Sequence, residues 1–223
     1  MSSAPRRLRL AVLISGRGSN MLAIARACAE GRLAADVVQV LSDDPAAPGL
    51  DAARAMGIPA EAVDRSRHRD ADGRPSRETF ERELRSRLDE ARPDLVVLAG
   101  FMRVLTADFV EAYACRMLNV HPSLLPAYKG LHTHERVLAD GIAQHGVSVH
   151  FVTAALDGGP VVLQARVPVL PGDTPQTLSA RVQREEHIVY PQVIQWIAEG
   201  RLQCAEGLPS FDGAPLRSPL QLY

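Results

Sequence analysis

The sequence lacks a strong charge of either sign. It has 25 basic and 26 acidic residues, which leaves a formal net charge of −1 over 223 residues. No overall field therefore favours nucleic acid, and any contact with a phosphate has to be local. A single lysine, Lys129, stands among the basic residues, and we take no chemistry from that bias.

A targeting segment and a membrane anchor are also missing. The apolar run at 10–14 is too short for the hydrophobic core of a signal peptide, and no cleavage pattern follows it. We expect a cytoplasmic protein with no membrane partner.

Cysteine is scarce, and its spacing matches no known framework. Cys28, Cys115 and Cys204 are odd in number and far apart, so they form no CxxC pair, no zinc-ligand spacing and no obvious disulfide framework. We predict three reduced thiols with structural roles.

Histidine is present in one region without a metal motif. No HExxH or similar spacing occurs there, so we predict no metal. Residues 132–134 are predicted to form an extended segment. The histidines of this region are His132, His134, His145 and His150.

The sequence does have a regular alternation of apolar strands and helices. Hydrophobic residues make up 46% of the chain, enough for a substantial core. The alternation predicts an α/β, Rossmann-like fold, with a mainly parallel twisted sheet and helices on both faces. Strands are predicted at 8–14, 36–41, 58–63, 95–99, 117–121, 147–152 and 161–169, and helices at 19–30, 46–56, 77–90 and 175–199.

Ligands of open α/β sheets bind outside the carboxyl ends of the strands. The loops at Gly16, Gly100, Asn119 and Asp157 all follow predicted strands, so they could share one cleft. The segment 204–223 is rich in glycine and proline, and we expect an irregular tail there.

The first of these loops, Ser15-Gly-Arg-Gly-Ser-Asn20, joins a strand to a helix. Glycines permit tight turns, and exposed helix N–H groups attract an anion, so the loop could cradle a phosphate. It lacks the complete GxGxxG spacing and the lysine of a P-loop, which argues against a dinucleotide site. The alternative is that Ser19 or Asn20 merely caps the helix.

The strand at 117–121 ends in Asn119-Val-His121, and two-residue alternation points both polar side chains to one face. Their N–H groups could stabilise the oxygen of a carbonyl that becomes tetrahedral. Asp157 lies on a glycine-rich turn, and beside His121 it would favour the proton-donating form of the imidazole. The alternatives are a loop-capping Asn, a structural His and an ordinary Asx turn.

Several motifs together resemble the glycinamide ribonucleotide formyltransferases over roughly residues 8–203. The HPSLLP segment is shared with other folate formyltransferases, so it specifies the chemistry better than the substrate. The motifs are Gly18-Ser-Asn20, Leu98-Ala-Gly-Phe-Met-Arg103, Asn119-Val-His-Pro-Ser-Leu-Leu-Pro126, Gly130-Leu-His-Thr-His134 and Leu156-Asp-Gly-Gly159.

The resemblance implies transfer of the formyl group of 10-formyltetrahydrofolate to the amine of glycinamide ribonucleotide in purine synthesis. It implies a single domain with a phosphate-binding half at about 8–100 and a catalytic, folate-binding half at about 101–203. Small-molecule substrates and a monomer or homodimer are expected. Asn119, His121 and Asp157 would be catalytic.

The same resemblance implies the binding residues. Gly18, Ser19, Asn20, Gln183 and Glu186 would bind the ribonucleotide. The folate would contact Arg77, Met102, Arg103, Val104, Leu105, Asn119, Thr153 and Asp157. Arg17, where related chains have Asn, and the loop at 72–75 depart from the family pattern.

Three other functions compete with this interpretation. In a formyltetrahydrofolate deformylase, water would replace the amine, but such enzymes usually carry an added N-terminal domain. A methionyl-tRNA formyltransferase typically has a further C-terminal domain, which is not expected here. A nucleotide-binding module without catalysis would not need Asn119, His121 and Asp157.

Overall fold

The computed structural model describes residues 6–222, and the chain folds into two compact units. The first unit contains the chain up to Arg103 together with Ile194–Gly200, and the second contains Val104–Val193 and the chain from Arg201 onward. Part of the segment on which we based the absence of a signal peptide, residues 1–5, lies outside the described residues.

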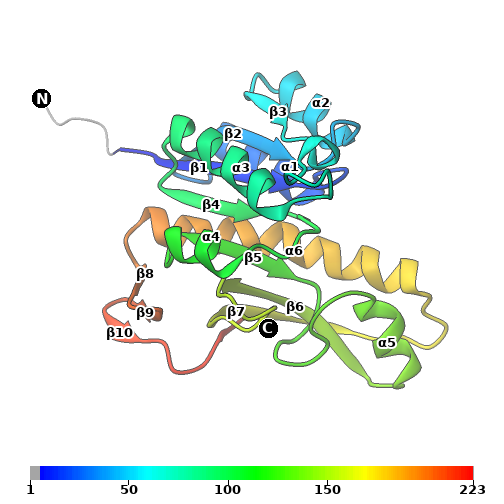
Figure 1. Ribbon diagram of the computed structural model, residues 1–223. Helices are drawn as coiled ribbons and strands as arrows, with labels where there is room; N and C mark the ends of the chain where they lie inside the picture. The colour runs from blue at the N-terminus through cyan, green and yellow to red at the C-terminus, as the bar shows by residue number, and fades with distance from the viewer. Residues whose placement is uncertain (1–5, 223) are drawn as a thin grey trace, which may run out of the picture. The chain divides into compact units, whose positions relative to one another are not determined.

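The first unit is a parallel sheet with helices packed against it (Figure 1). Strand β1 lies between β2 and β4, and β3 pairs with the other edge of β2. Its strands are β1 (Leu8–Ile14), β2 (Ala35–Ser42), β3 (Ala60–Ala62) and β4 (Leu95–Leu98). Its helices are α1 (Ser19–Ala29), α2 (Pro48–Ala55), the short η1 (Arg65–Arg67) and α3 (Arg77–Ala91).

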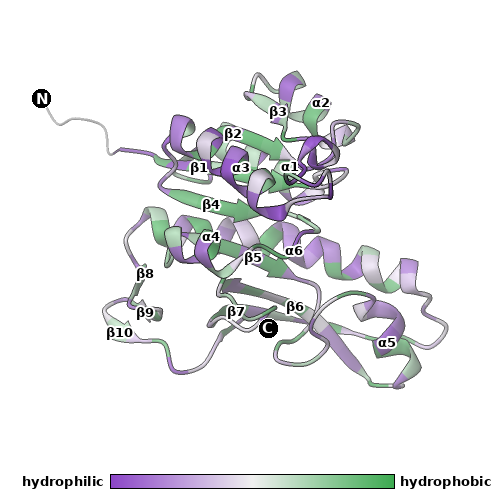
Figure 2. Ribbon diagram, viewed as in Figure 1, coloured by the Kyte–Doolittle hydropathy of each residue, from purple (hydrophilic) through white to green (hydrophobic). Residues whose placement is uncertain are grey.

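The hydrophobic pattern explains this arrangement. Residues 10–14 of β1 are fully buried, as expected of a central parallel strand covered on both faces. Strand β4 is uniformly apolar, whereas α3 is mainly hydrophilic and buries only the stripe that contains Phe80, Leu84 and Leu88 (Figure 2).

The second unit has a mixed sheet. Strand β6 is antiparallel to both β5 and β7, and β11 is parallel to β7. The strands are β5 (Met117–His121), β6 (Gln144–Phe151), β7 (Val161–Pro168) and β11 (Leu220–Leu222). The helices are α4 (Ala107–Ala112), α5 (Thr133–Ala139) and α6 (Pro175–Ala198), the last of which runs into the residues of the first unit. Parallel pairings predominate among these strands, and the predicted α/β class is confirmed.

The prediction of an irregular C-terminal tail is wrong. Residues 202–215 form a small antiparallel sheet of β8 (Leu202–Ala205), β9 (Leu208–Phe211) and β10 (Ala214–Pro215). Two-residue turns connect these strands, and both residues of each turn have positive φ: 52° and 77° at Glu206 and Gly207, 48° and 79° at Asp212 and Gly213. Such turns match the twist of a hairpin, so these glycines form strand connections rather than a disordered segment.

Two further expectations need correction. The segment 132–134 is not extended, because His132 has φ 57° at the N-cap of α5 and Thr133 begins that helix. Cys115 and Cys204 are not separate thiols, since they form a disulfide with a Cα–Cα distance of 5.2 Å. The two cysteines are 89 residues apart, so only the tertiary fold could reveal the pair.

Candidate active site

Asn119 lies opposite His150 on the neighbouring strand. The antiparallel register pairs Asn119 of β5 with His150 of β6, and places Ser148 opposite His121. Directly opposed residues project to the same face of a sheet, so the two polar pairs share one face. The Asn119 Nδ2 atom lies 3.3 Å from His150 Nε2.

The contacts of His150 define its protonation. Its Nδ1 lies 2.9 Å from the carbonyl oxygen of Phe151, which can only accept, so Nδ1 carries a hydrogen. Burial lowers the pKa of His150, which favours the neutral ring. The Nε2 lone pair of a neutral His150 then accepts a hydrogen bond from the amide of Asn119, which fixes the orientation of that amide.

His121 lies between two acceptors. Its Nε2 is 2.8 Å from the carbonyl oxygen of Tyr128, and its Nδ1 is 3.5 Å from Asp157 Oδ2. Each ring nitrogen of His121 that carries a hydrogen can therefore donate to one of these oxygens.

The carboxylate of Asp157 connects the two histidines. Its Oδ2 accepts a 2.8 Å hydrogen bond from the backbone N–H of Gly130, and its Oδ1 lies 3.8 Å from His150 Nε2. The Asp157 side chain is only 9% exposed, and the residue has φ 44°, a conformation that non-glycine residues adopt at some energetic cost. The loop thus holds Asp157 in a fixed position beside His121.

The turn that follows His121 is held by a buried polar network. Ser148 Oγ donates to the Ser123 carbonyl at 2.7 Å and accepts from the Leu125 N–H at 3.0 Å. Gln164 Nε2 donates to the Leu125 carbonyl at 2.9 Å. Because buried polar groups are costly unless they are paired, this complete network makes the turn a defined structure.

His150, Ser148 and Gln164 were not predicted to be parts of this site. The sequence Val-Ser-Val-His-Phe at 147–151 could have indicated His150 and Ser148, because these polar residues alternate with apolar ones in a buried strand. Gln164 had no such signal, since its partners lie on other segments.

In the first unit, the loop at 15–20 leads into α1. Gly18 is the N-cap residue, has φ 70°, and contributes no side-chain cap, so neither predicted alternative cap residue occupies that position. The carbonyl of Gly16 accepts from the N–H of Gly49 at 3.0 Å, and Ser15 Oγ accepts from the N–H of Met102 at 2.8 Å. The first two residues of the loop are therefore fixed by backbone donors from other segments.

The other residues of the first unit that the resemblance singled out lie on its surface. Arg77 is exposed at the start of α3, after the N-cap Ser76. Met102 is 65% exposed. Arg103 is anchored by a 2.8 Å contact between its Nε and the buried carboxylate of Asp43.

Other residues that the resemblance implies for binding lie in the second unit. Gln183 and Glu186 are both on α6, where Gln183 is half-buried and Glu186 is buried. Val104 is exposed, Leu105 is buried, and Thr153 is exposed at the start of the loop that carries Asp157. The structure brings Asn119, His121 and Asp157 together in this unit.

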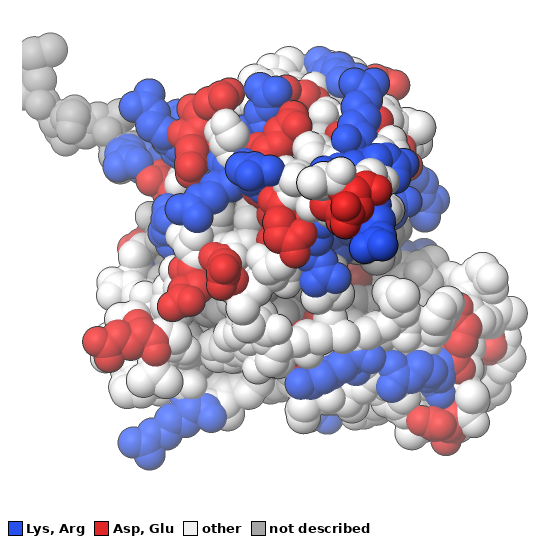
Figure 3. All heavy atoms as spheres, in the orientation of Figure 1, with Lys and Arg blue, Asp and Glu red and all other residues white. Residues whose placement is uncertain are grey.

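Basic and acidic side chains interleave over much of the face shown in Figure 3. Within residues 6–222, no group of three or more His, Cys, Asp or Glu side chains is arranged to hold a metal ion. None of the helices in this range combines the length and hydrophobicity that crossing a membrane requires.

Comparisons with known proteins match nearly the whole chain. A family model described as formyl transferase matches residues 8–194. The chain is 49% identical to phosphoribosylglycinamide formyltransferase of Escherichia coli (strain K12), an alignment that covers 97% of this chain and 98% of that protein.

Solved structures agree with this match. The structure of phosphoribosylglycinamide formyltransferase from Coxiella burnetii has a TM-score of 0.90 and 46% identity, and covers 97% of this chain and 100% of its own. A formyltetrahydrofolate deformylase from Pseudomonas putida KT2440 has a TM-score of 0.81 but 22% identity, and the match covers 94% of this chain and 72% of that chain. The likeness to the deformylase shows a shared fold.

Proposed function

The chain belongs to the formyl transferase family, and from this membership we propose that it is a phosphoribosylglycinamide formyltransferase. It transfers the formyl group of 10-formyltetrahydrofolate to the amine of glycinamide ribonucleotide, a step of purine synthesis. The products are formylglycinamide ribonucleotide and tetrahydrofolate. Both substrates are small molecules, and the reaction is expected in the cytoplasm.

The observation that carries the proposal is the chain of contacts from Asn119 through His150 and Asp157 to His121. In the proposed mechanism the neutral amine attacks the formyl carbon, and negative charge develops on the formyl oxygen. The amide N–H of Asn119 that His150 does not use, together with the Nε2–H of His121, would donate to this oxygen. To do so, the Nε2–H of His121 would exchange its hydrogen bond to the Tyr128 carbonyl for one to the substrate.

Asp157 has two roles in this proposal. Its carboxylate holds the imidazolium of His121 in orientation, and it takes part in moving the proton from the attacking amine toward the folate nitrogen that leaves. The buried position and the left-handed backbone of Asp157 support a function beyond that of an ordinary turn residue.

Substrate binding is assigned by family membership together with local geometry. Gly18, Ser19 and Asn20 would bind the phosphate, since the start of α1 offers helix N–H groups without a side-chain cap from Gly18. Gln183 and Glu186, one helical turn apart on α6, would bind the rest of the ribonucleotide. The folate would contact Arg77, Thr153, Asn119, Asp157 and the main chain of 102–105.

The test is an acceptor assay. Purified protein is incubated with 10-formyltetrahydrofolate in the presence and absence of glycinamide ribonucleotide, and the products are separated. Formylated ribonucleotide that appears only with the acceptor supports the proposal. Formate released without acceptor would identify a hydrolase instead, and no turnover in either mixture would indicate a binding module.

A further inference from the structure

The Cys115–Cys204 pair lies outside the residues proposed for catalysis, yet it is connected to the strand that carries two of them. Cys115 is in the connection between α4 and β5, two residues before β5 begins at Met117. Cys204 is on β8, where it pairs with Pro209 of β9. The disulfide therefore ties the β8–β9 hairpin to the segment that leads directly into Asn119 and His121.

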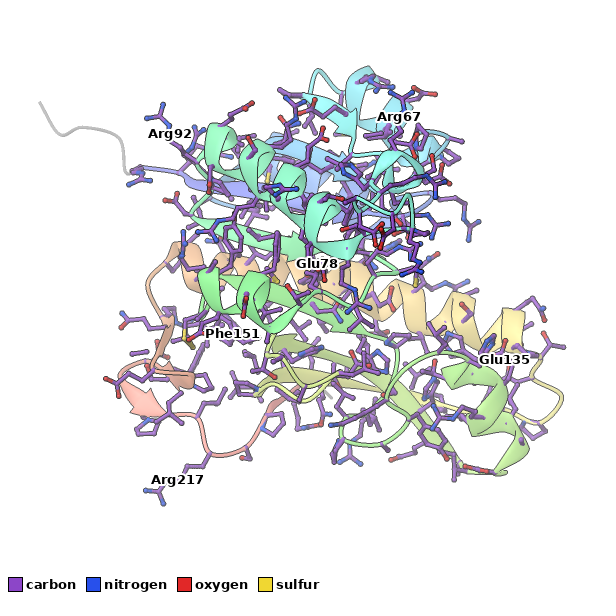
Figure 4. All side chains as sticks on the ribbon, viewed as in Figure 1. Arg67, Glu78, Arg92, Glu135, Phe151 and Arg217 are labelled. Carbon is purple, nitrogen blue, oxygen red and sulfur yellow. A yellow bond between two sulfur atoms is a disulfide. The ribbon has the colours of Figure 1, made fainter. Side chains whose placement is uncertain are left out.

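Both cysteines also line a cavity of about 250 Å³ in the second unit. Its wall is mainly apolar and includes Val110 of α4, Phe151 at the end of β6, and the following residues Val152 and Thr153. Figure 4 labels Phe151 and draws the disulfide in yellow. The hairpin with Cys204 thus forms one wall of the cavity, and the start of the Asp157 loop forms another.

The two sulfur-bearing residues are accessible. Cys115 and Cys204 are both half-buried, and the cavity that they line is partly open, so a small dithiol can reach the bond. The remaining cysteine, Cys28, is a free thiol that differs in its environment: burial raises the pKa of its thiol to about 11. Little thiolate is available at Cys28 near neutral pH, so it competes poorly in exchange with the pair.

We propose that Cys115 and Cys204 form a reversible thiol–disulfide site whose oxidised state keeps the Asp157 loop packed for folate binding. The second part of this inference rests on the proposed function. In a cytoplasmic protein a disulfide is more often a redox-responsive element than a permanent crosslink. The position of this pair, on the surface of a cavity and not in the core, fits that role.

The redox step is ordinary thiol–disulfide exchange. A thiolate of a dithiol reductant attacks one sulfur of the pair, and the other sulfur leaves as a thiolate and takes up a proton. The second thiol of the reductant then displaces the remaining protein sulfur. Two electrons and two protons pass to the protein, which gains two thiols, and the reductant becomes a cyclic disulfide.

Reduction should act on the loop through packing. Without the crosslink, the β8–β9 hairpin can separate from the α4–β5 connection and remove one wall of the cavity. Val152 keeps its 2.9 Å hydrogen bond to the Met117 carbonyl, but Thr153 and Ala154 lose the opposing apolar surface. We expect the loop from Thr153 to Asp157 to become less ordered, with Asn119 and His121 left in place on β5.

The first experiment counts thiols and measures melting. Protein equilibrated with oxidised dithiothreitol should show one titratable thiol in denaturant, and protein equilibrated with reduced dithiothreitol should show three. Reduction should lower the Tm by about 5–15 °C, because the crosslink restricts a long segment of the unfolded chain. The double variant Cys115→Ser/Cys204→Ser should melt like the reduced protein under both conditions.

Cys28→Ser is the matched control and should keep the full redox response. Three thiols after oxidation, or the same Tm in both states, would overturn the proposal.

The second experiment measures kinetics in both redox states. Reduction should raise the KM for 10-formyltetrahydrofolate about three- to tenfold, as expected if the competent loop is populated only part of the time, and should leave the KM for the ribonucleotide unchanged. Equal folate KM values would refute the connection to the loop. Absence of formyl transfer in both states would instead refute the proposed function, while the thiol count and the melting shift would still decide whether the redox site exists.

Discussion

At the residue scale, the central feature is one carboxylate shared by two unlike histidines. Asp157 lies 3.5 Å from His121 Nδ1 and 3.8 Å from His150 Nε2, but the Asn119 amide is nearer to His150 Nε2, at 3.3 Å. His150 donates from Nδ1 to a carbonyl and can accept at Nε2. These partners of His150, and the burial that lowers its pKa, favour a neutral ring that accepts from the Asn119 amide.

Replacing the shared carboxylate tests the proposed mechanism most directly. Asp157→Asn keeps the shape of the side chain but removes its charge and its ability to take up a proton. We expect kcat to fall by about 10²- to 10⁴-fold, whereas binding of glycinamide ribonucleotide stays within about twofold of wild type. Steady-state kinetics and calorimetric titration measure the two quantities, and near-normal turnover would remove Asp157 from the mechanism.

His150 is expected to position Asn119 without contacting the substrate. His150→Ala should lower kcat about two- to tenfold, the usual value of one neutral hydrogen bond, with little change in either KM. His150→Gln, which can still offer an acceptor to Asn119, should recover part of the loss. If both variants are equally impaired, or if they raise KM instead of lowering kcat, His150 does not act through the Asn119 amide.

At the element scale, the loop proposed for the phosphate depends on close contact with α2. A Cβ atom added at Gly49 would lie 2.5 Å from Ile14 Cδ1 and 2.8 Å from the Gly16 carbonyl oxygen. Only glycine therefore allows α2 to approach the loop and to donate the 3.0 Å hydrogen bond from Gly49 to Gly16. The position of α2 therefore depends on the conformation of the loop, and the loop conformation depends on α2.

Gly49→Ala should displace the loop. We expect the KM for glycinamide ribonucleotide to rise about tenfold, and the free energy of unfolding to fall by about 1–3 kcal/mol because of overpacking. Gly57→Ala is the matched control, since Gly57 follows the same helix with φ 74° but an added Cβ would meet nothing within 4 Å. That control should lose stability through backbone strain and keep its KM, so an equal rise in KM for both variants would exclude a local effect on the loop.

At the scale of the whole molecule, the buried His145, paired with the half-buried His134, makes stability depend on pH. His134 Nδ1 lies 3.1 Å from His145 Nε2. Burial, followed by the neighbouring His134, lowers the pKa of His145 to about 4, below its ordinary value of 6.5. The unfolded chain therefore binds a proton that the folded chain does not between these pH values, and the stability that His145 contributes above pH 6.5 is lost as the pH falls toward 4.

Urea unfolding between pH 7 and pH 4.5 tests this linkage. Wild type should lose up to about 3 kcal/mol more of its unfolding free energy over this range than His145→Gln. His132→Gln is the control, because the His132 side chain is 75% exposed and takes no part in the His134–His145 contact, and this variant should follow the wild-type profile. Parallel pH profiles for wild type and His145→Gln would show that another group causes any acid sensitivity.

Much of the architecture was predictable from local sequence. Apolar runs with β-branched residues predicted the main strands, and helical periodicity predicted α1, α2, α3 and α6, because both patterns reflect which side of one element is buried. The two-residue period also predicted that Asn119 and His121 share a face. The β8–β10 sheet was missed because its glycines and prolines were interpreted as a loop, although Asp212-Gly213 is a hairpin signal.

The family was also predictable, since short motifs at fixed places along the chain resemble those of formyltransferases. The roles assigned to the individual site residues remain predictions, to be decided by the variants described above.

The sequence by itself determined the seven strands β1 to β7, the helices α1, α2, α3 and α6, the position of the glycine loops and the Asn-x-His strand end. Each of these depends on residues close together in the chain. Only the tertiary structure decided that His150 faces Asn119, that Gly130 and His121 hold Asp157, and that Cys204 meets Cys115. These pairings depend on strand register and on packing between segments far apart in sequence, and local periodicity carries no information about either. The candidate site residues therefore lie in local motifs, whereas their hydrogen-bond partners come from segments far away in the sequence.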